Sequence, residues 1–134
     1  MNEKVLRILE FDKVIDKLQS YAGSEPARKM CKSLRPSGNI EWIANSQNET
    51  EAALLRLFKS DRISFGANKD IREMIKSIEI GRTLSIIELL EIARLLECVD
   101  ALCKYGEKDE DDPIDVIDKY FERLTSLPLL KKEI

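Results

Sequence analysis

Apolar residues recur every three or four positions along most of this chain, which is the spacing of amphipathic helices. The first stripe covers residues 5–22, and Gly23 permits the helix to stop there. Ser24 has the side chain of a helix N-cap, and Pro26 suits the first turn that follows. The pattern therefore predicts one helix before Gly23 and a second one that ends before Pro36. Almost no loop separates these two helices, so we expect them to pack as neighbours.

A longer helix is predicted over residues 40–59, with a heptad-like seam that is apolar at both ends and polar in its middle. The seam consists of Ile43, Gln47, Thr50, Leu54 and Leu57. Such a helix either changes partners along its length or is exposed at its centre. Trp42 is expected to anchor its packing. The longest internal loop follows over residues 59–69, where Gly66 is a candidate hinge with a positive φ angle.

Two further helices begin at capping boxes, in which a small polar residue and an acidic residue three positions later cap each other. Asp70 and Glu73 form the first box, and this helix is expected to end at Gly81. Ser85 and Glu88 form the second box, at the start of the most apolar helix. Apolar residues lie on several sides of that helix, which predicts that more than one side of it is buried.

The last part of the chain predicts one more helix and the start of another. Gly106 is the expected C′ residue of the apolar helix, where a positive φ angle is common. A helix then covers residues 113–124, with Asp112 as its N-cap and Asp115 in its first turn, and residues 127–130 begin another turn. Together these elements predict an all-α fold, a bundle-like array of about six helices with one long polar-centred helix. We expect residues 1–134 to form a single segment.

The composition agrees with a helical protein and excludes several classes of enzyme. Of the 134 residues, 43% are hydrophobic, 35% are charged and only 6% are aromatic, which suits packed helices better than a β-sandwich. Histidine is absent, which removes Ser-His and Cys-His nucleophiles and histidine-ligated zinc. The sequence also lacks a glycine-rich phosphate-binding motif. We therefore expect no catalytic residue and no cofactor-binding residue in this chain.

An acidic run before the predicted last helix is the candidate for a metal site. Asp109, Asp111 and Asp112 could collect a divalent cation, but the run lacks the glycine of an EF-hand calcium loop. The same negative charges suit the positive end of the helix that is expected to follow. Helix capping is the simpler interpretation, so we expect no metal-ligating residue.

Charge is distributed unevenly, although the net charge is only −3. Residues 1–36 hold eight Lys or Arg against five Asp or Glu, a local net charge of +3, whereas residues 107–134 hold five against nine, a net of −4. Six basic residues of the first segment form a candidate patch for contact with a nucleic-acid backbone. They are Lys4, Arg7, Arg28, Lys29, Lys32 and Arg35. The alternative is that these basic residues form a solvated helix face, because aromatic residues for base stacking are not interleaved with them.

The sequence predicts neither export nor membrane insertion. The first residues lack the basic and apolar regions of a signal peptide, and charges interrupt the most apolar stretch, residues 84–102. The three cysteines, Cys31, Cys98 and Cys103, are sparse and odd in number, which is typical of reduced thiols. We therefore expect a cytoplasmic protein without a membrane partner.

The opening stretch, residues 6–15, resembles the start of the MutS-II proteins, the second bacterial branch of the MutS family, which carry a C-terminal Smr nuclease domain. Further similarities follow in the expected order along the whole chain. They are Tyr21-Ala22-Gly23-Ser24-Glu25, Leu34-Arg35-Pro36, Glu49-Thr50 with Ala53, Phe65-Gly66, Asp70-Ile71-Arg72, and Gly81 with Leu84-Ser85. The chain departs from the family where Ala67 replaces a second glycine and Asn68-Lys69 replace a stretch that often carries proline. These changes bear on the conformation of the loop.

The resemblance implies that the chain is the N-terminal part of the helical core, or lever, region of a larger protein. In that family the clamp, the dimerising P-loop ATPase and the Smr domain come later in the chain. The full-length protein would be a homodimer that uses ATP and Mg and acts on branched DNA in repair and recombination, or on stalled ribosomes. The segment itself would catalyse nothing. It would carry ATP-driven movement from the ATPase domain to the clamp that grips DNA or the ribosome.

A self-contained helical protein–protein interaction module is the alternative. It predicts an exposed apolar patch that an unrelated protein occupies, in a chain that is complete as written. The MutS-like hypothesis instead predicts an ATPase encoded beyond Ile134, and the abrupt end of the pattern leads us to expect that residue 134 is a junction to more protein. An independent enzyme ranks third, because the sequence offers no acid–base or nucleophile arrangement.

Overall fold

The computed structural model describes residues 3–59, 63–66, 68–108 and 113–134. Within these ranges every regular element is a helix, which confirms the all-α prediction. The eight helices are α1 (Glu3–Ile8), α2 (Phe11–Tyr21), α3 (Glu25–Ser33), α4 (Ile40–Lys59), α5 (Arg72–Glu79), α6 (Ile86–Gly106), α7 (Asp118–Phe121) and α8 (Pro128–Glu133). The turn predicted at residues 127–130 begins α8. None of the described helices has the length and apolar character needed to cross a bilayer.

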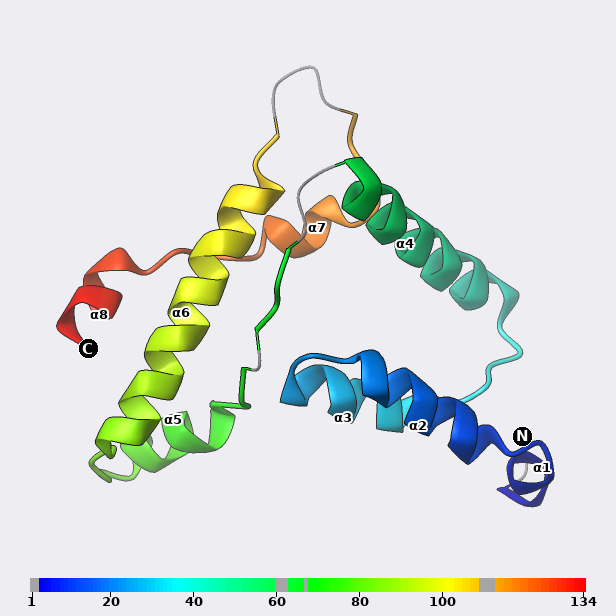
Figure 1. The fold of residues 1–134 in the computed structure, drawn as a ribbon, viewed down its shortest axis with the longest axis horizontal. Helices are drawn as coiled ribbons and strands as arrows, with labels where there is room; N and C mark the ends of the chain where they lie inside the picture. Colours follow the sequence, from blue (N-terminus) through cyan, green and yellow to red (C-terminus); the bar gives the residue numbers. More distant parts are fainter. Residues whose placement is uncertain (1–2, 60–62, 67, 109–112) are drawn as a thin grey trace.

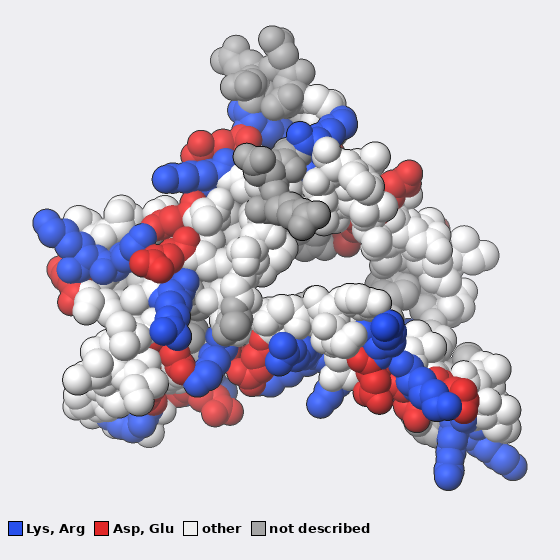
Figure 2. Space-filling view, in the orientation of Figure 1, with Lys and Arg blue, Asp and Glu red and all other residues white. Residues whose placement is uncertain are grey.

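The helices form an open array (Figure 1). α2 and α3 lie side by side along one edge, α6 with α5 and α8 forms a second edge, and α4 forms a third. α7 lies where one end of α4 and one end of α6 approach each other. Figure 2 shows an opening between α4 and the α2–α3 pair. The two long helices are therefore joined at one end, through α7.

The buried core of the described residues is small and divided. Its apolar members are Leu6, Ile15, Leu96 and Ile117. The first two belong to α1 and α2, and the other two belong to α6 and to the turn before α7. Many large apolar side chains stay exposed, including Phe58 at 78% and Ile114 at 90%. Apolar burial therefore stabilises local groups of helices more than it fixes the arrangement of the three edges.

The prediction of one continuous helix over residues 5–22 is wrong, because the chain breaks into α1 and α2 at Glu10. This residue has a left-handed backbone conformation with a φ angle of 51°. In a continuous helix Leu6 and Ile15, nine positions apart, would project about 180° from each other. The break brings both side chains, with Phe11, to the wall of one cavity between α1, α2 and α3. Burial of these side chains offsets a left-handed backbone cost of about 1–2 kcal/mol.

Ser24 caps α3 as predicted, since its hydroxyl accepts a hydrogen bond from the amide of Ala27 at 3.3 Å. α2 and α3 pack against each other, which confirms the expected pairing of neighbours. The loop after α4 is attached to the first residue of α3. The amide of Glu25 donates to the carbonyl of Asn68 at 3.1 Å, and the amide of Asp70 donates to the Glu25 carboxylate at 3.3 Å.

α4 spans Ile40–Lys59, the range that the apolar periodicity predicts. Asn39 caps its start, because its side-chain oxygen accepts a hydrogen bond from the amide of Trp42 at 3.1 Å. The predicted role of Trp42 as a packing anchor is wrong, since half of its surface is exposed. Gln47 and Thr50 are exposed, in agreement with the interpretation of a helix that is open at its centre.

The two predicted capping boxes have different outcomes. At α6 the box is present: the Ser85 hydroxyl accepts from the amide of Glu88, and the Glu88 carboxylate accepts from the amide of Ser85 at 2.8 Å. At α5 the predicted box is absent, since the N-cap position is taken by Ile71 and no side chain caps it. The Asp70 carboxylate accepts from the backbone amide of Arg72 at 3.3 Å and also binds the side chains of Arg72 and Lys29, so the helix start and nearby cations share it.

α5 ends at Glu79, and Gly81 terminates it from the C′ position as predicted, with a φ angle of 84°. The amide of Gly81 donates to the carbonyl of Ile78 at 2.8 Å, and the amide of Arg82 donates to the carbonyl of Ser77 at 2.9 Å. This pair of hydrogen bonds is a Schellman motif. The prediction that more than one side of α6 is buried is wrong at the start of this helix, where Ile86 is exposed.

Two predictions near the C-terminal end are wrong. Gly106 is the last residue of α6 and does not have the positive φ angle of a C′ glycine. The helix predicted over residues 113–124 is reduced to α7, Asp118–Phe121. Asp115 precedes this short helix, and its side chain contacts α4 instead of capping a first turn. Asp112, the predicted N-cap, lies outside the described residues.

Candidate functional site

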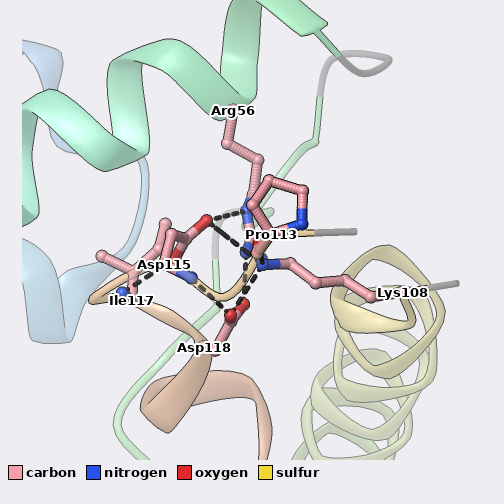
Figure 3. Close-up of polar contacts among 6 residues, drawn as sticks. All are labelled: Arg56, Lys108, Pro113, Asp115, Ile117 and Asp118. Carbon is pink, nitrogen blue, oxygen red and sulfur yellow. Dashed lines mark hydrogen bonds and ion pairs between the residues drawn. The ribbon is translucent and has the colours of Figure 1, made fainter. Parts of the chain in front are cut away.

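Four charged side chains meet where the ends of α4 and α6 approach α7, and we call this cluster the junction (Figure 3). They are Arg56, Lys108, Asp115 and Asp118. Arg56, on α4, is only 9% exposed, which is rare for an arginine unless it is paired. Since 59 residues separate Arg56 from Asp115 along the chain, the junction is a tertiary contact.

Arg56 binds both carboxylates of the junction. Its Nη2 donates to Asp115 Oδ2 at 2.5 Å, and its Nε donates to the same oxygen at 3.2 Å. Nη2 also donates to Asp118 Oδ1. The guanidinium carbon lies 4.8 Å from the centre of the Phe121 ring, which is a cation–π contact. Nη1 is buried and has no hydrogen-bond partner among the described residues.

Lys108 supplies the second cation, from the segment that follows α6. Its Nζ donates to Asp118 Oδ2 and to the carbonyl of Pro113, both at 2.6 Å, and lies 3.6 Å from Asp115 Oδ2. Asp118 Oδ2 also accepts a hydrogen bond from the amide of Asp115 at 2.8 Å. Two cations therefore face two carboxylates, and each charge has an opposite partner, as buried charges require.

The electrostatics of the junction keep both carboxyl groups ionised. Burial raises the pKa of Asp118, but hydrogen bonds from Lys108, the Asp115 amide and Arg56 outweigh burial and hold this pKa at about 2. Burial likewise opposes the lowering of the pKa of Asp115, which the amide of Ile117 and the Arg56 side chain bring about. Neither group exchanges a proton near neutral pH, so the junction offers no general acid or base. It can hold helices together.

A second polar contact joins α4 to α7. Glu49 Oε1 accepts a hydrogen bond from Lys119 Nζ at 2.5 Å, and Glu49 Oε2 accepts one from the Tyr120 hydroxyl at 2.9 Å. Glu49 and Arg56 are about two helical turns apart, so they project from the same side of α4. This side, which we call the docked face, is held to α7 by charged and polar contacts.

The structure distributes the six candidate nucleic-acid residues among different environments. Arg7, Lys32 and Arg35 line the cavity between α1, α2 and α3, which has a volume of about 430 Å³. Asp12 and Asp16 line the same cavity. Figure 2 shows acidic and basic side chains next to each other over α2 and α3. These three basic residues are therefore gathered in one place, but beside opposite charges.

The other three candidates lie elsewhere on the same helices. Lys29 pairs with Glu25 at 2.9 Å and with Asp70 at 3.2 Å. Arg28 Nε donates to a backbone carbonyl in the turn between α2 and α3 at 3.0 Å. Lys4 is an exposed residue of α1. Contact of the six residues with nucleic acid stays a prediction.

Gly66, the candidate hinge, has a φ angle of 60°, as expected for a turn glycine. The loop around it is attached to α6. The carbonyl of Phe65 accepts a hydrogen bond from Cys98 Sγ at 3.4 Å, and Lys69 Nζ forms an ion pair with Glu91. Movement about Gly66 stays a prediction.

Within the described ranges, no three His, Cys, Asp or Glu side chains are arranged so that they could hold a metal ion. The candidate metal residues Asp109, Asp111 and Asp112 lie outside those ranges. Cys31, Cys98 and Cys103 are free thiols. Among the described residues the two buried charged side chains, Arg56 and Asp118, both belong to the junction.

The sequence patterns did not identify the junction. They assigned Asp115 to the first turn of a helix and gave Arg56 no role. One signal was present, because Arg56 is the charged residue in an otherwise apolar stretch, residues 52–58. A charge in such a stretch needs an opposite partner when it is buried. The sequence alone does not say which distant carboxylate supplies that partner.

Comparison with known proteins places the chain in a family. No protein-family model matches it. The endonuclease MutS2 of Lachnoclostridium phytofermentans is 37% identical over 140 residues, and that of Lachnospira eligens is 37% identical over 134 residues. The putative endonuclease MutS2 of Bacillus subtilis is 32% identical over 136 residues. Each of these alignments covers 100% of this chain. The chain belongs to the MutS2 family.

The family assignment confirms the resemblance to MutS-II proteins that residues 6–15 and the ordered motifs indicate. The chain spans only 16% to 18% of the length of these MutS2 relatives. It therefore corresponds to one segment of a MutS2 protein. The endonuclease activity for which these relatives are named belongs to them as whole proteins.

Proposed function

We propose that this chain is the N-terminal core, or lever, segment of a MutS-like ATPase, and that it catalyses no reaction itself. The observation that carries the proposal is the alignment of the entire chain with MutS2 endonucleases, of which it spans less than a fifth. The similarity of residues 6–15 to the start of MutS-II proteins supports the N-terminal position. Residues 1–134 are then one structural segment that works only with the rest of the protein.

In the full-length protein the partners of this segment are the clamp and ATPase domains of its own chain. That protein is a cytoplasmic homodimer that uses ATP and Mg and carries an endonuclease domain at its C-terminus. It binds branched DNA, recombination intermediates or stalled ribosomes in an ATP-dependent way. The segment transmits the movement that ATP produces.

The junction suits a part that transmits movement. Charge-assisted hydrogen bonds fix geometry more narrowly than apolar contact does. Because Arg56 and Glu49 bind the α7 region through such bonds, a displacement of α7 pulls the docked face of α4 with it. The remaining length of α4 lies at the edge of the open array and can move as a rigid arm (Figure 1).

Direct contact with nucleic acid is a minor part of this proposal. Arg7, Lys32 and Arg35 are the residues best placed to touch a phosphate backbone, because they share one cavity wall. Asp12 and Asp16 beside them reduce the local positive charge. This segment therefore adds a weak, salt-sensitive contact to the grip of the whole protein.

A self-contained helical interaction module is the second candidate function. The many exposed apolar side chains favour it, because large exposed apolar surfaces mark interaction sites. The two candidates differ in what covers these surfaces. A module binds an unrelated protein, whereas a MutS2 segment contacts the rest of its own polypeptide.

The size of the native protein separates the two candidates. An antibody raised against residues 1–134 should detect a protein several times larger than 15.4 kDa in the cells that make it. Mass spectrometry of that protein should find peptides of a P-loop ATPase domain. A native protein of 15.4 kDa would contradict the MutS-like proposal and favour the interaction module.

A further inference from the structure

We propose that the seam of α4 is a docking surface for an amphipathic helix in the part of the MutS2 polypeptide outside this chain. The seam consists of Ile43, Gln47, Thr50, Leu54 and Leu57. The proposal rests on the proposed function, because it takes the docking helix from the same long polypeptide.

The seam and the docked face are different sides of α4. At 100° per residue, the five seam residues project about 90–170° away from the mean direction of Glu49 and Arg56, the residues that bind α7. Gln47 and Thr50 are exposed, and Leu54 is 52% exposed. α4 is thus attached on one side and open on another, at the edge of the array (Figure 1).

The pattern of the seam specifies its occupant as a helix. The seam residues alternate between spacings of four and three, which is the spacing of a coiled-coil contact. The partner needs apolar side chains opposite Ile43 and Leu57 and hydrogen-bonding side chains opposite Gln47 and Thr50. Glu51 borders the seam and is exposed, so a lysine or arginine on the partner completes the match.

The length of the seam favours a partner in the same polypeptide over a second copy of the chain. The seam covers about two heptads, whereas helices that pair between separate chains usually need at least about three. An antiparallel pair of copies centred on Thr50 would also bring two Glu51 side chains together. A helix in the same polypeptide acts at an effective concentration of about millimolar, which suffices for a weak contact. The MutS2 relatives supply that length, because this chain spans only 16% to 18% of them.

Single-cysteine variants of the full-length protein test the proposal, after Cys31, Cys98, Cys103 and every cysteine in the rest of the polypeptide are replaced by serine. Leu54→Cys places a thiol on the seam. Leu55→Cys is the matched control, because Leu55 is also 52% exposed but lies about 100° round the helix. The rate of alkylation by a small maleimide is measured in the full-length protein and in the 134-residue chain. The Leu54→Cys thiol should react about tenfold more slowly in the full-length protein, while the Leu55→Cys rate should be similar in both.

Three results would overturn this assignment. Equal rates for Leu54→Cys in the two proteins would mean that the seam stays open. Equal slowing at Leu54→Cys and Leu55→Cys would mean that the seam is not the specific contact. Slow, concentration-dependent alkylation of Leu54→Cys in the 134-residue chain would identify a second copy as the occupant. Failure of the proposed function is distinct from all three, because it would be visible as a native protein of 15.4 kDa.

Discussion

The side chain of Phe121 fills the space beside Gly106 that a larger residue would need. A Cβ atom on Gly106 would lie 2.5 Å from Phe121 Cβ and 2.7 Å from Phe121 Cγ, well inside van der Waals contact. The Phe121 ring is held from other sides by Tyr105, at 5.8 Å between ring centres, and by Arg56. Close packing of α6 against α7 therefore requires glycine at this position.

We expect Gly106→Ala to lower the free energy of unfolding by about 1–2 kcal/mol. Overpacking costs about 1–3 kcal/mol, and a contact of 2.5 Å with Phe121 Cβ places Gly106→Ala in the upper part of this range, above the gain of about 1 kcal/mol in helix propensity. Denaturant unfolding followed by circular dichroism measures the difference. Gly38→Ala is the control, because nothing lies within 4 Å of its added Cβ atom, and its stability should hardly change. A Gly106→Ala variant as stable as the wild type would show that α6 and α7 can move apart freely.

Asp118 should make the stability of the chain sensitive to acid. Its pKa is about 2 in the folded state against an ordinary value of 3.8, so the unfolded state binds more protons between these values. The contribution of Asp118 is present above pH 4 and is lost as the pH falls towards 2. It amounts to about 1–2 kcal/mol.

The test compares unfolding free energies of the wild type and Asp118→Asn from pH 6 to pH 2. Glu88, whose pKa is also about 2, contributes to both proteins in the same range, so the difference between them isolates Asp118. The wild type should be more stable than Asp118→Asn at pH 6, and this difference in unfolding free energy should shrink towards pH 2. Glu122→Gln, at an exposed position, is the control. A difference in unfolding free energy that stays constant with pH would contradict the ion pairing of Asp118.

At the scale of elements, the helices with strong local signals were predictable from the sequence. α4 has the predicted bounds, and α3 and α6 begin at the predicted caps, Ser24 and Ser85. The break at Glu10 and the shortness of α7 were not predictable in this way. Both depend on tertiary contacts: the shared cavity of Leu6 and Ile15, and the attraction of Asp115 to Arg56. Helix periodicity contains no information about such partners.

The capping box of α6 gives a prediction at this scale. Ser85→Ala removes the hydroxyl that accepts from the Glu88 amide, and it should cost on the order of 1 kcal/mol. Thermal unfolding of the variant and the wild type measures this loss. Ser20→Ala, in the last turn of α2, removes a hydroxyl that caps no helix start and should have a smaller effect. An unchanged thermal midpoint in Ser85→Ala would indicate that α6 does not depend on this cap.

At the scale of the whole molecule, the all-α class and the MutS-like assignment were predictable, but the open arrangement was not. Apolar stripes on every helix are compatible with a closed bundle as well as with an open array. The difference depends on which stripes find partners inside the chain. Leu54 and Phe58 find none that buries them among the described residues, whereas the charged Arg56 does.

The 134-residue chain by itself should show no ATP turnover and only weak DNA binding. Arg7, Lys32 and Arg35 lie beside acidic residues, so binding should be weak, and it should fall as salt rises because it depends on contacts with phosphates. Fluorescence anisotropy with a branched DNA measures the affinity and its salt dependence. Replacing these three residues by glutamine should remove the residual binding, and Lys13→Gln outside the cavity should not. Tight binding at physiological salt would contradict a mainly mechanical role.

The coupling between ATP and partner binding in the full-length protein tests the lever role most directly. The measurement is the ratio of the affinities for branched DNA with and without ATP, together with the rate of ATP turnover. Arg56→Met, and more mildly Glu49→Gln, should reduce this ratio towards one and leave ATP turnover unchanged, because they disconnect α4 from α7. Glu41→Gln, at an exposed position in the first turn of α4, should keep the wild-type ratio. A folded Arg56→Met protein that retains the full effect of ATP, or that loses ATP turnover itself, would contradict the account.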